Sequence, residues 1–201
     1  MRRKNDGCHG GSSGLRIISG QWRGRKLPVA NVKGLRPTPD RVRETVFNWL
    51  APYIVDAKVL DCFSGSGALA LEALSRGAAS AIMLEKATPA VKILNNNIAL
   101  LSATQASVIN TDALSWLNQP AEAAFDIVFL DPPFSKQLLL KTCQLLSKQG
   151  YIVAGSIIYI EAENTLSLTG MPPQWHLFKE KNAGQIRYTL WQVKVPMGYP
   201  L

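Results

Sequence analysis

Four carboxylates follow apolar runs along the chain, and their spacing predicts a ligand site. Each stands near the end of an expected strand: Asp61, Glu85, Asp112 and Asp131. The carboxyl ends of parallel strands meet at one edge of a sheet, so these side chains should lie near one another. An acid on the first strand can pair with an ammonium group. One on the second can accept both hydroxyls of a ribose, and one on the third can accept from an adenine amine. Taken singly, each acid is explained as well by a turn or helix-cap role as by ligand binding. Taken together, the acids favour a ligand that carries an ammonium group, a ribose and an adenine.

The loop after Asp61 narrows the choice of ligand. In "DCFSGSG", Gly65 and Gly67 allow the backbone to turn tightly and to approach a ligand closely. A dinucleotide loop would read G-x-G-x-x-G, and a Walker loop would continue into Gly-Lys-Ser/Thr; neither is present. The loop and the four acids predict S-adenosylmethionine. The arrangement resembles that of the Rossmann-like methyltransferases, whose commoner loop has a glycine where Phe63 stands.

"DPPF", Asp131 to Phe134, is the segment expected to act on the substrate. An exocyclic base amine is a poor nucleophile because its lone pair delocalises into the ring. The Asp131 carboxylate and the Pro132 carbonyl can accept the two amine hydrogens and help to localise that pair on nitrogen. Pro132 and Pro133 fix the loop, and Phe134 can stack on an extruded base. The amine would then displace a methyl group from a sulfonium sulfur. Positioning supplies most of the rate of such a displacement, and no metal is needed.

"DPPF" is similar to the D/N-P-P-Y/F motif of amino-methyltransferases that act on adenine N6, guanine N2 or cytosine N4. It therefore indicates the reaction without choosing the base. On its own, the segment could be no more than a turn that closes a strand.

The elements that must hold these residues alternate between strand and helix. Strand patterns are expected at 57–63, 80–86, 106–113, 125–134 and 156–163, and helix patterns at 36–50, 67–78, 88–101, 114–119 and 135–150. This alternation predicts a parallel sheet with helices on both faces, to which 175–193 adds two antiparallel strands. The predicted fold class is α/β: a Rossmann-like class I methyltransferase fold. It has a mostly parallel seven-stranded sheet, a C-terminal antiparallel hairpin and a small N-terminal β extension.

The helix at 36–50 has a clear predicted start. Thr38 can cap it, Pro39 fits the first helical position, and Asp40 suits the positive end of the helix dipole. Helical spacing places four apolar residues in one stripe: Val42, Val46, Trp49 and Leu50.

Basic residues are concentrated at the N-terminus. Residues 1–43 hold eleven of the 22 Lys and Arg but only two of the 14 acids, which leaves the rest of the chain nearly neutral. A basic arm suits a polyanion, because phosphates that it neutralises release counterions. Apolar residues alternate with the bases of 16–43, which favours a folded, phosphate-facing arm; the bases at 2–4 fit a solubilising tail. We expect a disordered basic tail at 1–14, a β-hairpin extension at 15–34 and a methyltransferase domain at 35–201.

Several other classes of protein are disfavoured. The three cysteines are odd in number and form no CxxC, so neither a disulfide framework nor a zinc site is expected. No apolar run of about 18 residues and no signal-peptide pattern is visible, which predicts a cytoplasmic protein without a membrane span.

Four segments, taken together, are similar to one family. They are "RIISGQWRGRKL" (16–27), "LRPTPDRVRETVFNWL" (35–50), "LDCFSGSGALALEALSRGA" (60–78) and "FLDPPF" (129–134). In this order they resemble the bacterial ribosomal RNA small-subunit methyltransferase D family. The resemblance implies methylation of N2 of one guanine in 16S rRNA, with S-adenosylmethionine as the cofactor. It further implies a monomer whose partner is RNA already organised by the proteins of the small ribosomal subunit.

The resemblance also implies roles for individual residues. Those expected to bind the cofactor are Thr38, Arg41, Asp61, Phe63, Ser64, Gly65, Gly67, Glu85, Lys86, Asp112 and Ala113. Those expected to hold the base are Asp131, Pro132, Pro133 and Phe134. Those expected to contact RNA are Arg23, Arg25, Lys26 and Arg36.

Three alternatives remain open on the sequence. A DNA adenine-N6 methyltransferase would share "DPPF", but it would normally carry a larger target-recognition domain than this short arm. A non-catalytic RNA-binding assembly factor would have no need for the intact Asp131 and cofactor loop. A nicotinamide-dependent oxidoreductase is disfavoured by the glycine spacing.

Overall fold

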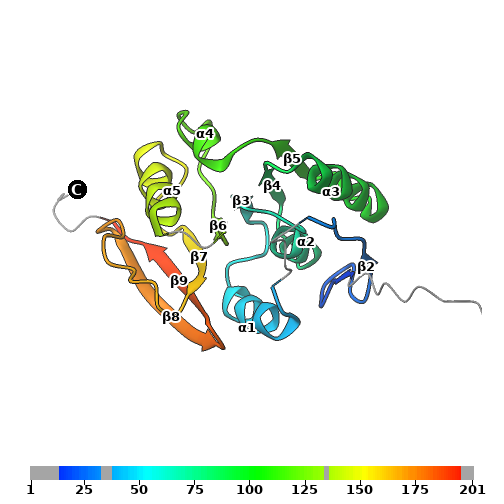
Figure 1. The fold of residues 1–201 in the computed structure, drawn as a ribbon, viewed down its shortest axis with the longest axis horizontal. Coiled ribbons are helices and arrows are strands. Elements are labelled where there is room, and N and C mark those ends of the chain that lie inside the picture. Colours follow the sequence, from blue (N-terminus) through cyan, green and yellow to red (C-terminus); the bar gives the residue numbers. More distant parts are fainter. Residues whose placement is uncertain (1–13, 33–37, 134–135, 196–201) are drawn as a thin grey trace, which may run out of the picture.

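The structure is a computed structural model that describes residues 14–32, 38–133 and 136–195 (Figure 1). The helices are α1 (Asp40–Leu50), α2 (Ala68–Ser75), α3 (Thr88–Leu101), α4 (Ala113–Leu117) and α5 (Lys136–Lys148). The strands are β1 (Leu15–Arg16), β2 (Lys26–Leu27), β3 (Lys58–Asp61), β4 (Ser80–Glu85), β5 (Ala106–Asn110), β6 (Ile127–Leu130), β7 (Ile157–Glu163), β8 (Trp175–Ala183) and β9 (Ile186–Val193).

Seven strands form one sheet in the order β5-β4-β3-β6-β7-β9-β8. The five strands from β5 to β7 are parallel, and β9 runs antiparallel between β7 and β8. The chain leaves β3 towards β4 and β5 on one side and returns to β6 and β7 on the other. The carboxyl ends of β3 and β6 therefore flank the switch point at which sheets of this kind bind ligands. The predicted fold class is confirmed.

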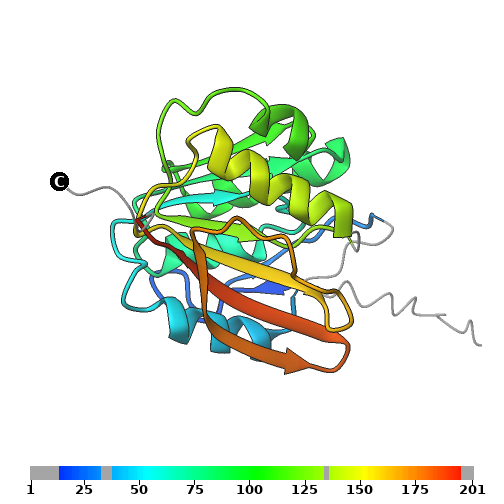
Figure 2. The same cartoon turned by 90° about the vertical axis from the view of Figure 1, so that its left-hand side faces the viewer.

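Helices cover both faces of this sheet (Figures 1 and 2). Helices α1, α2 and α3 lie on one face, and α4 and α5 lie on the other. Alternate residues of a strand point to opposite faces, so Val59 and Phe129 join the core of the first layer, whereas Leu60 and Val128 join that of the second. The first layer is called the α1 face below. The central strands read as continuous apolar runs because they are buried on both faces.

The start of α1 differs from the prediction. The helix begins at Asp40, with Pro39 at the cap position and no side-chain hydrogen bond to the helix end. The prediction that Thr38 caps this helix was wrong. Thr38 is buried, and its side chain hydrogen-bonds instead to Glu161 of β7. A tertiary contact has replaced the local capping interaction.

The N-terminal extension is part of the main core. Strands β1 and β2 pair antiparallel, and the side chains of Leu15, Ile17 and Leu27 are buried with those of α1 and α2. The expected tail at 1–14 lies almost wholly outside the described residues, as does the expected domain boundary at 34–35.

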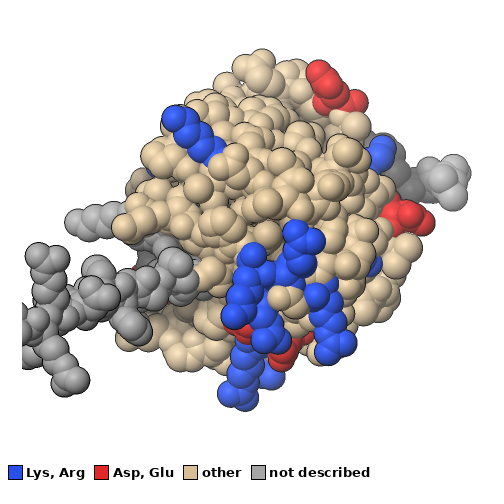
Figure 3. Space-filling view, turned by 90° about the vertical axis from the view of Figure 1, so that its right-hand side faces the viewer, with Lys and Arg blue, Asp and Glu red and all other residues tan. Residues whose placement is uncertain are grey.

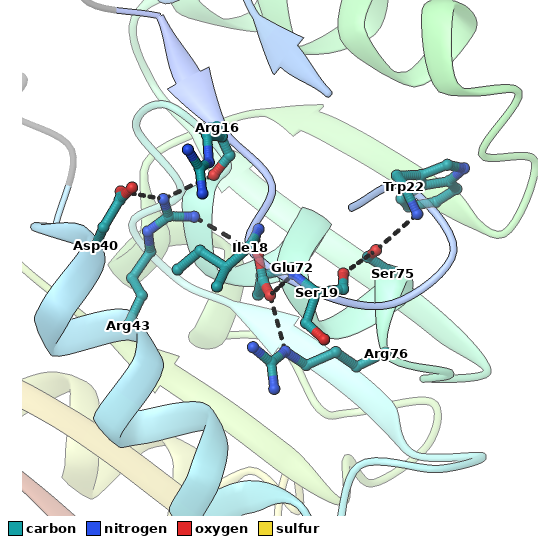
Figure 4. A network of polar contacts seen from close by, with 9 residues as sticks. All are labelled: Arg16, Ile18, Ser19, Trp22, Asp40, Arg43, Glu72, Ser75 and Arg76. Atoms are coloured by element: carbon teal, nitrogen blue, oxygen red, sulfur yellow. Dashed lines mark hydrogen bonds and ion pairs between the residues drawn. The ribbon is translucent and has the colours of Figure 1, made fainter. Parts of the chain in front are cut away.

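A buried acid fastens this extension to α2 (Figure 4). Glu72 is fully buried and is the one charged residue of α2; it accepts hydrogen bonds from the backbone N–H groups of Ile18 (2.8 Å) and Ser19 (3.0 Å). Arg76 Nε donates to the same carboxylate at 2.8 Å. Arg43 Nη1, from α1, lies 3.7 Å from it. These groups are called the Glu72 network, and they join the extension, α1 and α2.

Arg43 links the network to β1. Its Nη2 donates to the Arg16 carbonyl at 2.8 Å and to Asp40 Oδ1 at 2.6 Å, and its side chain is 1% exposed. Since a buried charge is costly without partners, Arg43 depends on Asp40 and the Arg16 carbonyl as well as on Glu72.

The extension approaches α2 most closely at Gly20. This residue has φ +80°, and a Cβ atom built there would lie 1.7 Å from the Ser75 carbonyl oxygen. The next two residues bond to Ser75: Gln21 N to its carbonyl oxygen at 2.7 Å and Trp22 N to its Oγ at 3.0 Å. Only glycine combines this φ with this contact.

Candidate functional site

The loop that follows β3 is anchored to both neighbouring strands. Cys62 N donates to the Phe129 carbonyl of β6 at 3.1 Å, and Ser64 N donates to the Leu84 carbonyl of β4 at 3.0 Å. Ser64 Oγ turns back to the Asp61 carbonyl at 3.0 Å. The loop therefore holds a fixed shape at the switch point, with Phe63 partly buried within it.

Both glycines of this loop have positive φ, as the sequence led us to expect of a tight turn. Gly65 has φ +50° and Gly67 has φ +77°. A Cβ atom at Gly67 would lie 2.6 Å from Leu94 Cδ2 of α3. Gly67 directly precedes α2, so it lets α3 pack closely against the point where α2 begins.

Glu85, the last residue of β4, lies against the same loop. Its Oε2 accepts from Gly65 N at 2.9 Å and its Oε1 accepts from Ala87 N at 2.7 Å. The carboxylate predicted to bind a ribose is thus held in position by two backbone donors.

Asp61 carries an unfavourable charge. The residue is 2% exposed. Burial raises the pKa of its carboxyl group to about 7. A hydrogen bond from Phe63 N opposes this shift, and the negative charge of Glu85 adds to it. A positively charged ligand group beside Asp61 would offset this cost.

Asp131 follows β6 directly, on the other side of the switch point. It keeps partial exposure to solvent, Pro132 is buried and Pro133 is exposed. Burial of the carboxyl group raises the pKa of Asp131 well above its ordinary value, and the negative charges of Glu161 and Asp61 raise it further. Phe134 lies outside the described residues.

The sequence analysis missed Glu161. This residue of β7 is 5% exposed, and Tyr159 Oη donates to its Oε2 at 2.8 Å. Burial raises the pKa of Glu161, against the effect of hydrogen bonds from Tyr159 and Thr38. The signal was an acid that follows four apolar residues inside "SIIYIEAE", a strand expected to be buried on both faces.

The third predicted acid has a local role. Strand β5 ends at Asn110, and Asp112 caps α4, with its Oδ1 accepting from Ser115 N at 3.1 Å. Ala113 is the buried first residue of that helix. Asn110, which we did not predict, ties the ends of β4 and β5 together, because its Nδ2 donates to the carbonyls of Glu85 (2.9 Å) and Lys86 (3.1 Å). Lys86 is exposed.

The predicted RNA contacts lie on the extension. Arg23, Arg25 and Lys26 are exposed, and Arg25 Nη2 donates to the Leu100 carbonyl near the end of α3 at 2.9 Å. Lys and Arg side chains gather on one part of the face shown in Figure 3, which is the side of the molecule that carries the extension.

Arg41 and Arg36 are the remaining predicted residues. Arg41 is exposed on the first turn of α1. Arg36 lies outside the described residues.

Two further features bear on the class of site. Within residues 14–32, 38–133 and 136–195, no group of three or more His, Cys, Asp or Glu side chains is arranged to hold a metal ion. No helix in this described part of the chain is long and apolar enough to cross a membrane.

Comparison with known proteins places the chain in a family. The family described as "Conserved hypothetical protein 95" matches residues 15–192. "Ribosomal RNA small subunit methyltransferase D" of Escherichia coli (strain K12) is 53% identical over 184 residues, which is 92% of each chain. The protein of that name from Haemophilus influenzae is 47% identical over 181 residues, 89% of this chain and 93% of the other.

A solved structure agrees with the sequence comparison. The Escherichia coli protein yhhF matches with a TM-score of 0.84 and 52% identity, over 90% of this chain and 98% of that one. The resemblance inferred from the four sequence segments is confirmed, and the chain belongs to the ribosomal RNA small subunit methyltransferase D family.

Proposed function

We propose that this protein transfers a methyl group from S-adenosylmethionine to the exocyclic N2 amine of a guanine in 16S rRNA of the small ribosomal subunit. The observation that carries the proposal is the meeting of Asp61, Glu85 and Asp131 around one switch point. Membership of the family supports the RNA substrate.

The residues fit the cofactor. Asp61, a buried acid with a raised pKa beside Glu85, favours a cationic partner such as the ammonium of the methionine end. The Glu85 carboxylate can accept the ribose hydroxyls, and Asp112 and Ala113 stand where the adenine would lie. Gly65, with its positive φ, lets the loop turn tightly so that its backbone can approach the ligand closely. When bound, S-adenosylmethionine supplies a methyl group on a positively charged sulfur.

The protein's contribution to the reaction centres on Asp131. Its carboxylate and the Pro132 carbonyl accept the two hydrogens of the base amine and orient the nitrogen lone pair towards the methyl group. As the new N–C bond forms, the nitrogen must lose a proton. A carboxylate whose pKa is raised is a stronger base than an ordinary aspartate, so Asp131 can take that proton.

The extension supplies the grip on RNA. Arg23, Arg25 and Lys26 project from a hairpin that is fixed to the core. Such charges bind phosphates without reading sequence. We therefore propose that the shape of the RNA and its protein context, rather than base contacts of this short hairpin, select the target guanine.

Methyl transfer from labelled S-adenosylmethionine tests the function directly. The acceptors are small subunits that lack the modification, naked 16S RNA and duplex DNA, and each product is digested to nucleosides for mass analysis. N2-methylguanosine from the subunits is expected. N6-methyladenine in DNA would overturn the substrate, and no transfer to any acceptor despite cofactor binding would favour a non-catalytic assembly factor.

Two variants test the role of Asp131. We expect Asp131→Ala to lower transfer by at least about 100-fold, the scale of general-base catalysis, with cofactor affinity unchanged. Glu163→Ala is the control, since Glu163 is an exposed acid at the end of β7. Substantial residual turnover by Asp131→Ala would refute the role.

A further inference from the structure

We propose that Glu161 is a positioning residue that acts through Asp131: its buried negative charge makes Asp131 a stronger proton acceptor for the base amine. The inference rests on the role proposed above for Asp131, and it names a group that lies on a different strand, outside the "DPPF" segment.

Strand register brings the two carboxylates together. β6 and β7 are parallel neighbours, with Phe129 opposite Tyr159 and Leu130 opposite Ile160. The rings of Phe129 and Tyr159 meet edge to face with centroids 6.0 Å apart, so both point to the α1 face. Side chains alternate along a strand, and Asp131 and Glu161, each two residues further on, therefore share that face.

Glu161 is held by uncharged donors. Tyr159 Oη donates to its Oε2 at 2.8 Å, and the Thr38 side chain, from the segment before α1, also bonds to it. These bonds fix the carboxylate without neutralising it. Tyr159 cannot relieve the charge by acting as an acid, because burial and the negative charge of Glu161 hold its pKa well above the ordinary value.

The groups around the pair are acidic or neutral in the described part of the chain. β3 contributes Asp61, β7 contributes Tyr159, and β9 contributes Tyr188, which lies opposite Glu161. On α1, Asp40 and Arg43 pair with each other in the Glu72 network, and Arg41 is exposed. A like charge nearby raises the proton affinity of a carboxylate, so Glu161 and Asp131 each make the other more basic.

The interaction between Glu161 and Asp131 affects where the proton released in the reaction goes. The nitrogen–carbon bond forms as the carbon–sulfur bond breaks, and the amine nitrogen releases one proton. With Glu161 ionised, Asp131 accepts that proton more readily, and the pair then carries one negative charge in place of two. Asp131 then releases the proton to solvent, to which the residue as a whole keeps partial exposure.

Glu161→Gln tests the proposal, because glutamine keeps an acceptor for Tyr159 and Thr38 but lacks the charge. We expect the acidic limb of the pH profile of kcat/KM to move down by about one pH unit, the scale at which coupled carboxylates titrate as a pair. Turnover on the plateau should fall about tenfold, whereas affinity for S-adenosylhomocysteine should stay within about twofold. Glu163→Gln, an exposed acid on the same strand, should change neither quantity.

A second measurement does not depend on turnover. Coupling between two sites is reciprocal, so the carboxyl carbon of Glu161, followed by NMR, should titrate about one pH unit lower in Asp131→Asn than in the unmodified protein. An unchanged pH profile in Glu161→Gln, or an unchanged titration in Asp131→Asn, would show that Glu161 is only structural. If the unmodified protein transferred no methyl group at all, the proposed function would fail instead, and the NMR result would still report on the coupling.

Discussion

Replacing Asp61 by asparagine should stabilise the free protein at neutral and alkaline pH while weakening its binding of the cofactor. Asp61 is 2% exposed, and burial raises the pKa of its carboxyl group from 3.8 to about 7. Asparagine keeps an oxygen that can accept from Phe63 N, as Asp61 Oδ1 does at 3.4 Å. The substitution therefore removes the charge with little change in shape.

The size and sign of the effect follow from the pKa. In the folded protein Asp61 holds its proton more tightly than in the unfolded chain, so its ionisation opposes folding. The cost is absent below about pH 4 and complete above about pH 7, where a pKa difference of about three units corresponds to about 4 kcal/mol. Between pH 5 and pH 8 this group alone should lower the free energy of unfolding by about 3 kcal/mol.

Urea unfolding at pH 5 and pH 8 measures this effect. The fall in the free energy of unfolding from pH 5 to pH 8 should be about 3 kcal/mol smaller in Asp61→Asn than in the unmodified protein. In a domain of this size that difference corresponds to about 6–12 °C in melting temperature. Glu122→Gln, at an exposed acid, is the control.

Calorimetry with S-adenosylmethionine should show weaker binding to Asp61→Asn, because a charge-assisted partner of the ammonium has been lost. If the free energy of unfolding showed the same dependence on pH in Asp61→Asn and in the unmodified protein, the unfavourable buried charge assigned to Asp61 would be refuted. Unchanged cofactor affinity would refute its role at the ammonium.

Three further predictions concern the extension. Gly20→Ala should destabilise the protein by more than about 4 kcal/mol, because its Cβ would lie 1.7 Å from the Ser75 carbonyl oxygen. The control Gly24→Ala, at a residue with φ +82° but no atom within 4 Å of the added Cβ, should cost only about 1–2 kcal/mol. Equal costs of the two substitutions in urea unfolding would contradict the proposed contact at Gly20. Glu72→Gln should cost about 3–5 kcal/mol in the same assay, since it leaves buried arginine charge without its partner; a loss below about 1 kcal/mol would mean that the network is not stabilising. Arg25→Ala should reduce the slope of log affinity for RNA against log salt by about one, and an unchanged slope would remove this side chain from the phosphate grip.

Much of the fold was predictable because its signals are local. Apolar runs and helical periodicity located each strand and helix, and the rule that parallel strands end at one edge of the sheet brought Asp61, Glu85 and Asp131 together. The tight turn of the loop after β3 followed from its two glycines, which is also a local property.

The misses share a different physical cause. Thr38 had the chemistry of a helix cap, but its hydrogen bond goes to Glu161, more than 120 residues away in the chain. Arg43 and Glu72 lie on different helices, and their contact with each other forms only when the helices are packed. A single acid inside an apolar run, as at Glu72 and Glu161, was the available signal that such a partner must exist. The roles of all the predicted site residues, Phe134 and Arg36 included, remain predictions.

The Glu72 network also determines how the protein should meet its substrate. The extension is ordered before any RNA arrives, so association requires no folding step and should incur little loss of chain entropy at the hairpin. We expect diffusion and electrostatic steering to govern the association rate, with a steep fall as ionic strength rises. The network is anchored on α2, the helix that begins at the loop proposed to hold the cofactor. If phosphates bind at the hairpin as proposed, we expect the place where the RNA backbone docks to determine which nucleotide can reach the switch point, because the hairpin is packed and hydrogen-bonded to α2.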